Sequence, residues 1–153
     1  MAEISRRAGV GMATLYRNFP GRRELLEALY TDEVDAICTA AAADGDESPA
    51  TTLIAWLGQV YAFFHSKRQV GAELLKHSER GNFFSESRDR VLAAGRPLLI
   101  AAQRGGEIRA DLTLEQILDM THAIATIDSD PEYVQPILQA AIDGLRSVKP
   151  RST

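Results

Sequence analysis

The stretch AEISRRAGVGMATLYRNFPGRRELL, residues 2–26, decides how this chain begins to fold. Its apolar side chains have the spacing of two short helices joined by a sharp turn. Gly9 falls at the turn, where glycine accepts a positive φ without steric cost. The pattern therefore predicts a helix-turn-helix over residues 3–19. The positions expected to face inward are Ile4, Ala8, Val10, Leu15 and Phe19.

The second of these helices, from about Gly11 to Asn18, carries the residues expected to contact DNA. Small side chains at its start allow close approach to the major groove. Hydroxyl and guanidinium groups can donate to phosphates or to base edges. Arg22 opens the next helix, where its charge and the helix N-terminus both favour a phosphate. The predicted DNA-binding residues are Gly11, Met12, Ala13, Thr14, Tyr16, Arg17 and Arg22.

Composition favours an all-α protein. The 153 residues are 45% hydrophobic and 25% charged, and Ala and Leu are abundant while runs of Val, Ile and Thr are absent. No apolar run approaches the roughly 20 residues that a membrane span needs, and the start does not resemble a secretory signal. A single cysteine, Cys38, fits a reducing compartment. We therefore expect a cytoplasmic protein without a membrane partner.

Charge is distributed unevenly along the chain. Residues 1–30 hold five arginines and three glutamates, a net charge of +2. Since the whole chain has a net charge of −4, residues 31–153 carry −6. A basic head on an acidic body is expected where only the head meets a polyanion. Chance scatter of charge explains the same numbers equally well.

Helix punctuation recurs along the remaining chain. Pro49 and Pro131 each stand at a first helical position, after Ser48 and Asp130. Thr113 and Gln116 have the spacing of a capping box. A long helix is predicted from about Ser85 to Arg104, ending at Gly105–Gly106. The pattern also predicts a separate shorter helix over 67–78 and a loop at RGNFF, residues 80–84.

The segment AGV…TLYRNFP, followed by a basic residue and ELL, resembles the DNA-binding region of TetR-family transcriptional regulators. The resemblance implies an all-α fold with a helix-turn-helix head on a larger helical-bundle body. It implies a DNA-binding region over residues 1–30, and an effector-binding and dimerisation domain over 31–148 that dimerises through the last two long helices. Such a protein would be a repressor that binds operator DNA as a homodimer and is released by a small-molecule effector.

Members of that family carry a full helix ahead of the position where this sequence has Met1. The resemblance thus implies that the first helix of the DNA-binding region is missing here. We expect a poorly ordered head, because Ile4, Leu15 and Phe19 would lose the helix that covers them. The alternative function is a dimeric small-molecule-binding module that has lost specific DNA binding.

Aromatic and polar-tipped side chains gather in the central helices. Trp56, Tyr61, Phe64 and His77 are the predicted ligand-binding residues, with ordinary core packing as the alternative. His65, His77 and Glu73 do not match a known metal-ligand spacing, so no metal site is predicted. No catalytic motif is present, so we expect neither an enzyme nor a cofactor.

Overall fold

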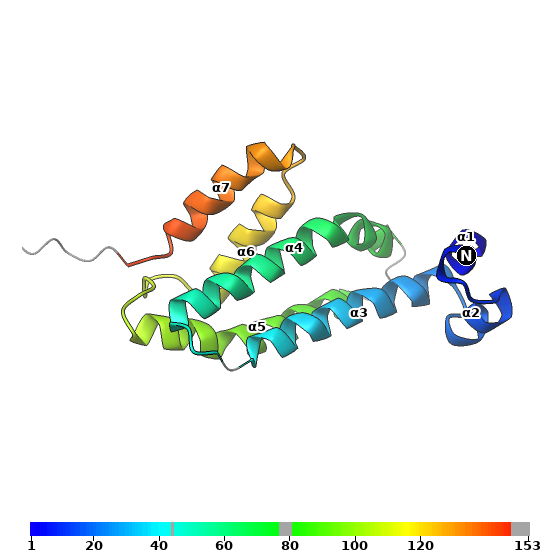
Figure 1. The fold of residues 1–153 in the computed structure, drawn as a ribbon, viewed down its shortest axis with the longest axis horizontal. Coiled ribbons are helices and arrows are strands. Elements are labelled where there is room, and N and C mark those ends of the chain that lie inside the picture. Colours follow the sequence, from blue (N-terminus) through cyan, green and yellow to red (C-terminus); the bar gives the residue numbers. More distant parts are fainter. Residues whose placement is uncertain (44, 77–80, 148–153) are drawn as a thin grey trace, which may run out of the picture.

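The computed structural model describes residues 1–43, 45–76 and 81–147, and these residues form seven α-helices and no strand. This confirms the all-α prediction. Two short helices make up the head at one end, and five longer ones make up the body (Figure 1). In chain order they are α1 (Ala2–Ala8), α2 (Met12–Asn18), α3 (Arg22–Ala41), α4 (Pro49–Lys76), α5 (Gly81–Arg104), α6 (Leu114–Ala125) and α7 (Pro131–Asp143).

The head contains the predicted helix-turn-helix. Gly9 ends α1 with φ 66°, the left-handed conformation that the turn requires. The Ser5 hydroxyl donates to the carbonyl of Val10, which fastens α1 to the start of the turn. Glu3 accepts hydrogen bonds from both Arg6 and Arg7 along the exposed side of α1. Local interactions thus stabilise α1 and the turn that follows it.

The prediction that the N-terminal helix is missing is wrong. The chain begins with α1, whose first turn is closed by the bond from the Ser5 amide to the Met1 carbonyl. The head is helical over residues 2–8 and 12–18, contrary to the expected fraying. Leu15 is only 6% exposed, although Ile4 is 37% exposed.

The predicted inward set of the head also needs correction. Ile4, Ala8 and Val10 are exposed, and Phe19 is partly buried. Ser5, a polar residue, is buried instead. Two helices of seven residues each can cover only the side chains that lie directly between them, so few apolar groups become buried.

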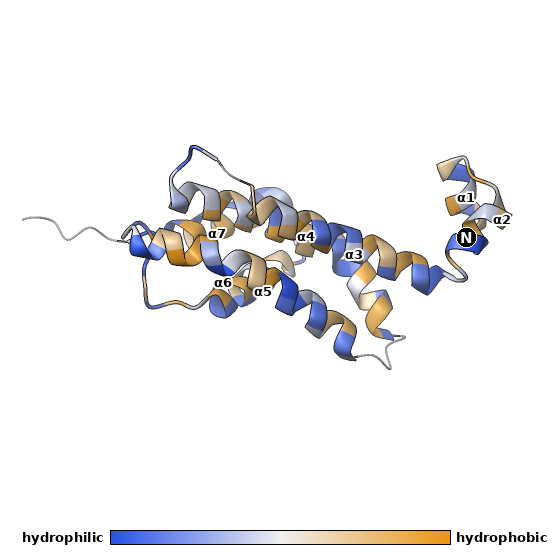
Figure 2. Ribbon diagram, turned by 90° about the horizontal axis from the view of Figure 1, so that it is seen from below, coloured by the Kyte–Doolittle hydropathy of each residue, from blue (hydrophilic) through white to orange (hydrophobic). Residues whose placement is uncertain are grey.

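Helices α3, α4, α5 and α6 pack around one hydrophobic core. Hydrophobic and hydrophilic residues alternate along these helices, as expected where one face of each is buried (Figure 2). Trp56 lies at the centre, 2% exposed, and its indole Nε1 donates to the Ile37 carbonyl across 3.0 Å. The core thus ties α4 directly to α3.

Two predicted boundaries in the middle of the chain are wrong. No break occurs near residue 67, since α4 runs without interruption from Pro49 to Lys76. The Ser66 hydroxyl donates to the Phe63 carbonyl of the same helix, so Ser66 does not cap the start of a new helix. The predicted RGNFF loop is also corrected, because α5 already begins at Gly81. Phe83 and Phe84 belong to its first turns, where they contact Tyr30.

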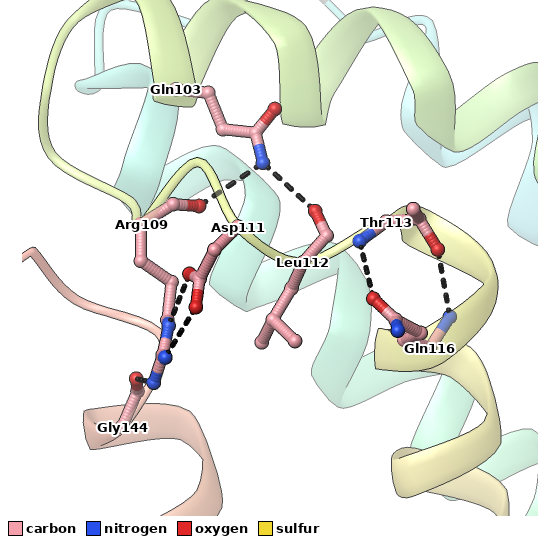
Figure 3. Close-up of polar contacts among 7 residues, drawn as sticks. All are labelled: Gln103, Arg109, Asp111, Leu112, Thr113, Gln116 and Gly144. Atoms are coloured by element: carbon pink, nitrogen blue, oxygen red, sulfur yellow. Dashed lines mark hydrogen bonds and ion pairs between the residues drawn. The ribbon is translucent and has the colours of Figure 1, made fainter.

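The connection from α5 to α6 is ordered by polar contacts (Figure 3). Thr113 and Gln116 form the predicted capping box, with each side chain bonded to the backbone of the other residue. The Gln103 amide donates to the carbonyls of Arg109 and Leu112, at 3.0 Å each. Arg109 forms two bonds to Asp111 and also donates to the Gly144 carbonyl. The loop is thereby joined to the end of α7.

Within the ranges that the structure describes, we find no helix with the length and apolar character of a membrane span.

Candidate DNA-binding head and effector cavity

Helix α2 presents one face to solvent and one to the rest of the head. Leu15 is its buried residue, and the positions on either side of it are exposed. All seven residues predicted to contact DNA are exposed: Gly11, Met12, Ala13, Thr14, Tyr16, Arg17 and Arg22. Met12 and Tyr16 are large side chains that the fold leaves open, at 39% and 45% exposure. Their role in DNA binding stays a prediction.

The arginines of the head divide into paired and unpaired groups. Arg6 and Arg7 share Glu3, and these hydrogen bonds, first of all that from Arg6, lower the pKa of the Glu3 carboxyl. Arg23 pairs with Glu27 at 2.8 Å. Arg17 and Arg22 form no ion pair with any residue that the structure describes. They are therefore the cations of the head that remain available to a phosphate.

One helix connects the head to the interior of the body. Helix α3 starts at Arg22, beside the head, and Tyr30 lies eight positions later on the same helix, about 12 Å along its axis (Figure 1). Tyr30 lines a cavity in the body that lies between α3, α4, α5 and α6. A continuous helix therefore links the candidate DNA-binding surface to that cavity.

The cavity has a volume of about 190 Å³ and lies between α3, α4, α5 and α6. A second cavity of about 220 Å³ adjoins it and extends along α4. The two share the side chains of Tyr30, Phe63, Phe64, Phe84 and His122. Together they approach the size of a small-molecule site in proteins.

Aromatic rings form a connected series around these cavities. Tyr30 contacts Phe63 and Phe84 edge to face, with ring centroids 5.0 and 5.4 Å apart. Phe63 in turn contacts Phe64, and Phe64 meets His122 at 4.9 Å. These rings come from four different helices, so the cavity wall is built by the packing of the whole bundle.

Few polar groups reach the inner cavity. Burial raises the pKa of Tyr30 to about 12, so its hydroxyl stays protonated at neutral pH. Ser87 is buried beside it on α5. Arg88 also lines the cavity, and its Nη2 lies 2.8 Å from Oδ1 of Asp119 on α6. A largely apolar space with a few polar groups suits a small organic ligand.

Of the four predicted ligand-binding residues, the three that the structure describes do not come together. Phe64 lines both cavities. Trp56 is in the core and Tyr61 stacks on His65, and neither lines either of these two cavities. His77 lies outside the described residues. The ligand-binding role of these side chains stays a prediction.

Sequence reasoning missed most of the lining residues. Tyr30 is the last residue of the predicted DNA-binding region, and Phe84 falls in the predicted RGNFF loop. Neither Arg88 nor His122 belongs to a sequence motif that would indicate a ligand site. Only the crossing of four helices brings these residues together, and no local spacing along the chain reports such a crossing.

His, Cys, Asp and Glu side chains do not gather anywhere in the described ranges into a group of three that could hold a metal ion. Cys38 is partly buried on α3, and burial raises the pKa of its thiol.

Comparisons with known proteins agree with this architecture. Residues 1–29 match the model of bacterial regulatory proteins of the tetR family, and residues 48–147 match the SbtR-like transcriptional regulator C-terminal domain. An uncharacterised HTH-type transcriptional regulator of Mycobacterium bovis is 31% identical, over 92% of this chain and 75% of its own length. A relative in Mycobacterium tuberculosis is 30% identical over the same shares.

Solved structures give the same result. A TetR transcriptional regulator from Streptomyces coelicolor superposes with a TM-score of 0.77 at 31% identity, covering 95% of this chain and 86% of that one. A tetR-family regulatory protein from Rhodococcus has the same fold, with a TM-score of 0.62 at 15% identity, over 97% and 86% of the two chains. These similarities define a helical, DNA-binding type of transcriptional regulator. The chain belongs to the TetR family.

Proposed function

We propose that this regulator is a repressor that binds a palindromic operator as a homodimer and releases it when a small molecule occupies the cavity in the body. The observation that carries this proposal is the single helix α3, which begins at the head with Arg22 and lines the cavity with Tyr30. Its place of action would be the cytoplasm, where operator DNA is accessible.

Binding of DNA by α2 is supported by the exposure of its predicted contact residues and by the absence of an ion pair at Arg17 and Arg22 within the described part of the chain. Phosphate contacts would fix the position of the head, while Thr14 and Tyr16 reach base edges in the major groove. We accordingly propose residues 1–30 as the DNA-binding region and 31–148 as the effector-binding and dimerisation domain.

Dimerisation through α6 and α7 is supported by apolar side chains that the single chain leaves uncovered. Tyr133 is 63% exposed and Ile137 is 36% exposed, both on α7. Two copies of the head related by a two-fold axis would read the two halves of a palindrome.

Release by an effector is supported by the composition of the cavity wall. Helices α3, α4, α5 and α6 all contribute to it, so a ligand can favour one arrangement of these helices over another. A shift of α3 would change the position of the head in each subunit. DNA affinity and ligand affinity would then be coupled reciprocally.

The test is fluorescence anisotropy with labelled DNA from the upstream region of the gene, at a stated salt concentration and against a scrambled control. We expect this 153-residue chain to prefer the upstream DNA. Equal affinity for both DNAs across the whole upstream region would contradict the proposal and favour a module that binds small molecules only.

A further inference from the structure

The formally charged side chains that line the two adjoining cavities are all cations, and each is paired with a carboxylate outside the two linings: Lys67 with Glu33, Arg68 with Asp128 and Arg88 with Asp119. The inner cavity has Arg88 and His122, and the outer one has Lys67, Arg68 and again His122. No aspartate or glutamate is among the described residues that line either space. The chemistry of the wall is thus aromatic and basic, which disfavours a cationic ligand and favours an anionic one.

Among these cations, Arg88 has the best position for a ligand in the inner cavity. It comes from α5, two helical turns before the buried core residue Gly95, and lies among the lining residues of the inner space. Its ion-pair partner Asp119 is directed toward solvent, with 67% of its side chain exposed. Exposed pairs of this kind contribute little, so the guanidinium can exchange this carboxylate for that of a ligand.

The volume limits the part of a ligand that can lie inside. An apolar cavity of about 150 Å³ is known to hold benzene, so the inner 190 Å³ has room for one aromatic ring. The adjoining space along α4 can take a second ring or a short substituent. Tyr30 already contacts both Phe63 and Phe84 edge to face, and a planar ligand would extend the same arrangement.

We propose that the cavity takes an aromatic carboxylate, whose rings pack against Tyr30, Phe63 and Phe84 while its carboxylate binds Arg88 beside His122. This inference depends on the proposed function only in treating the cavity as the effector site. It adds the chemical class of the ligand and the residue that selects its charge.

The structure offers a matched control for Arg88. Arg96 lies two turns further along α5 and pairs with Glu115 of α6 at 2.6 Å, in the same way that Arg88 pairs with Asp119. Both pairs therefore join α5 to α6 on the surface, but Arg96 lines neither cavity. Arg88→Gln and Arg96→Gln each remove one such pair and one positive charge.

The experiment is isothermal titration calorimetry of the full chain with four probes, namely naphthoate, naphthamide, naphthylmethylamine and octanoate. We expect naphthoate to bind at least about tenfold tighter than the other three. Arg88→Gln should abolish this preference over naphthamide, whereas Arg96→Gln should leave it within about twofold. Circular dichroism melting of both variants checks that each one is folded.

The inference is overturned by binding of none of the probes, by equal binding of naphthoate and naphthamide, or by equal loss of the preference in both variants. Octanoate binding as tightly as naphthoate would replace the aromatic carboxylate by an aliphatic one, and so also overturns it. The anisotropy assay on DNA is independent of these titrations. A wrong ligand class therefore leaves operator preference intact, whereas failure of the repressor proposal removes that preference.

Discussion

Gly95 of α5 lies directly against the indole ring of Trp56 of α4. A Cβ atom added at position 95 would be 2.3 Å from Cη2 of Trp56 and 3.0 Å from Cδ2 of Leu114. The indole cannot easily move away, because its Nε1 is bonded to the Ile37 carbonyl and the side chain is buried. The close approach of α4 and α5 therefore requires the absence of a side chain at this position.

We predict that Gly95→Ala destabilises the protein by about 1–3 kcal/mol, the usual cost of overpacking a core. The measurement is urea unfolding followed by the fluorescence of Trp56, the only tryptophan. Gly58→Ala is the control, since a Cβ at this position of α4 would meet no atom within 4 Å. That control should be neutral or slightly stabilising, because alanine has the higher helix propensity. Equal effects of the two substitutions would contradict the predicted steric cause.

A second prediction concerns Tyr30 and alkaline pH. Its pKa is raised to about 12 by burial, so the folded state keeps the phenol proton when the unfolded chain, with a pKa near 10, has lost it. The resulting contribution to stability is fully present below about pH 10 and is lost as the pH rises toward 12. The difference corresponds to at most about 3 kcal/mol.

Unfolding experiments at several values between about pH 9 and 11 would measure this loss against Tyr30→Phe, which cannot ionise. We expect the native chain to lose more stability over this interval than Tyr30→Phe does. Parallel curves for the two proteins would show that Tyr30 titrates normally. Absorbance titration of the phenolate provides a direct second reading.

The sequence predicted best those features whose cause is local. Gly9 ends α1 because the turn needs a positive φ, and Thr113 with Gln116 forms a capping box because both residues lie within one helical turn. The helix end at Arg104 followed from Gly105 and Gly106 in the same way. In each case the deciding residues are neighbours in the chain.

Features that depend on contacts between distant segments were predicted poorly. Nothing local in the sequence indicates that Trp56 donates to the Ile37 carbonyl and packs against Gly95 in the core. The continuity of α4 past Ser66 depends on packing against other helices, which offsets weak local signals. Arg88 reaches the cavity only because α5 crosses α3 and α6 beside it.

A third prediction tests the proposed phosphate contacts of the head. Arg17→Ala and Arg22→Ala should each weaken operator binding and reduce its dependence on salt, since each removes one phosphate contact per subunit. For a dimer, the slope of log K against log salt should fall by about two. Arg104→Ala is the control, because it removes the same charge at the far end of α5 (Figure 1). A similar slope change in all three variants would indicate a general charge effect.

The last prediction concerns the proposed dimer interface. Ile137 and Tyr133 leave an apolar surface on α7, and in a dimer this surface would be removed from water. Ile137→Glu places an unpaired charge there, and burial of such a charge costs far more than the interface gains from this side chain. We expect this variant to be a monomer at micromolar concentration in sedimentation velocity, while the unchanged chain is a dimer.

Gln135→Glu adds the same charge at an exposed position of α7, roughly 200° around the helix from Ile137, and should remain a dimer. A dimeric Ile137→Glu variant would place the interface on another surface, whereas loss of the dimer in both variants would indicate long-range repulsion between subunits.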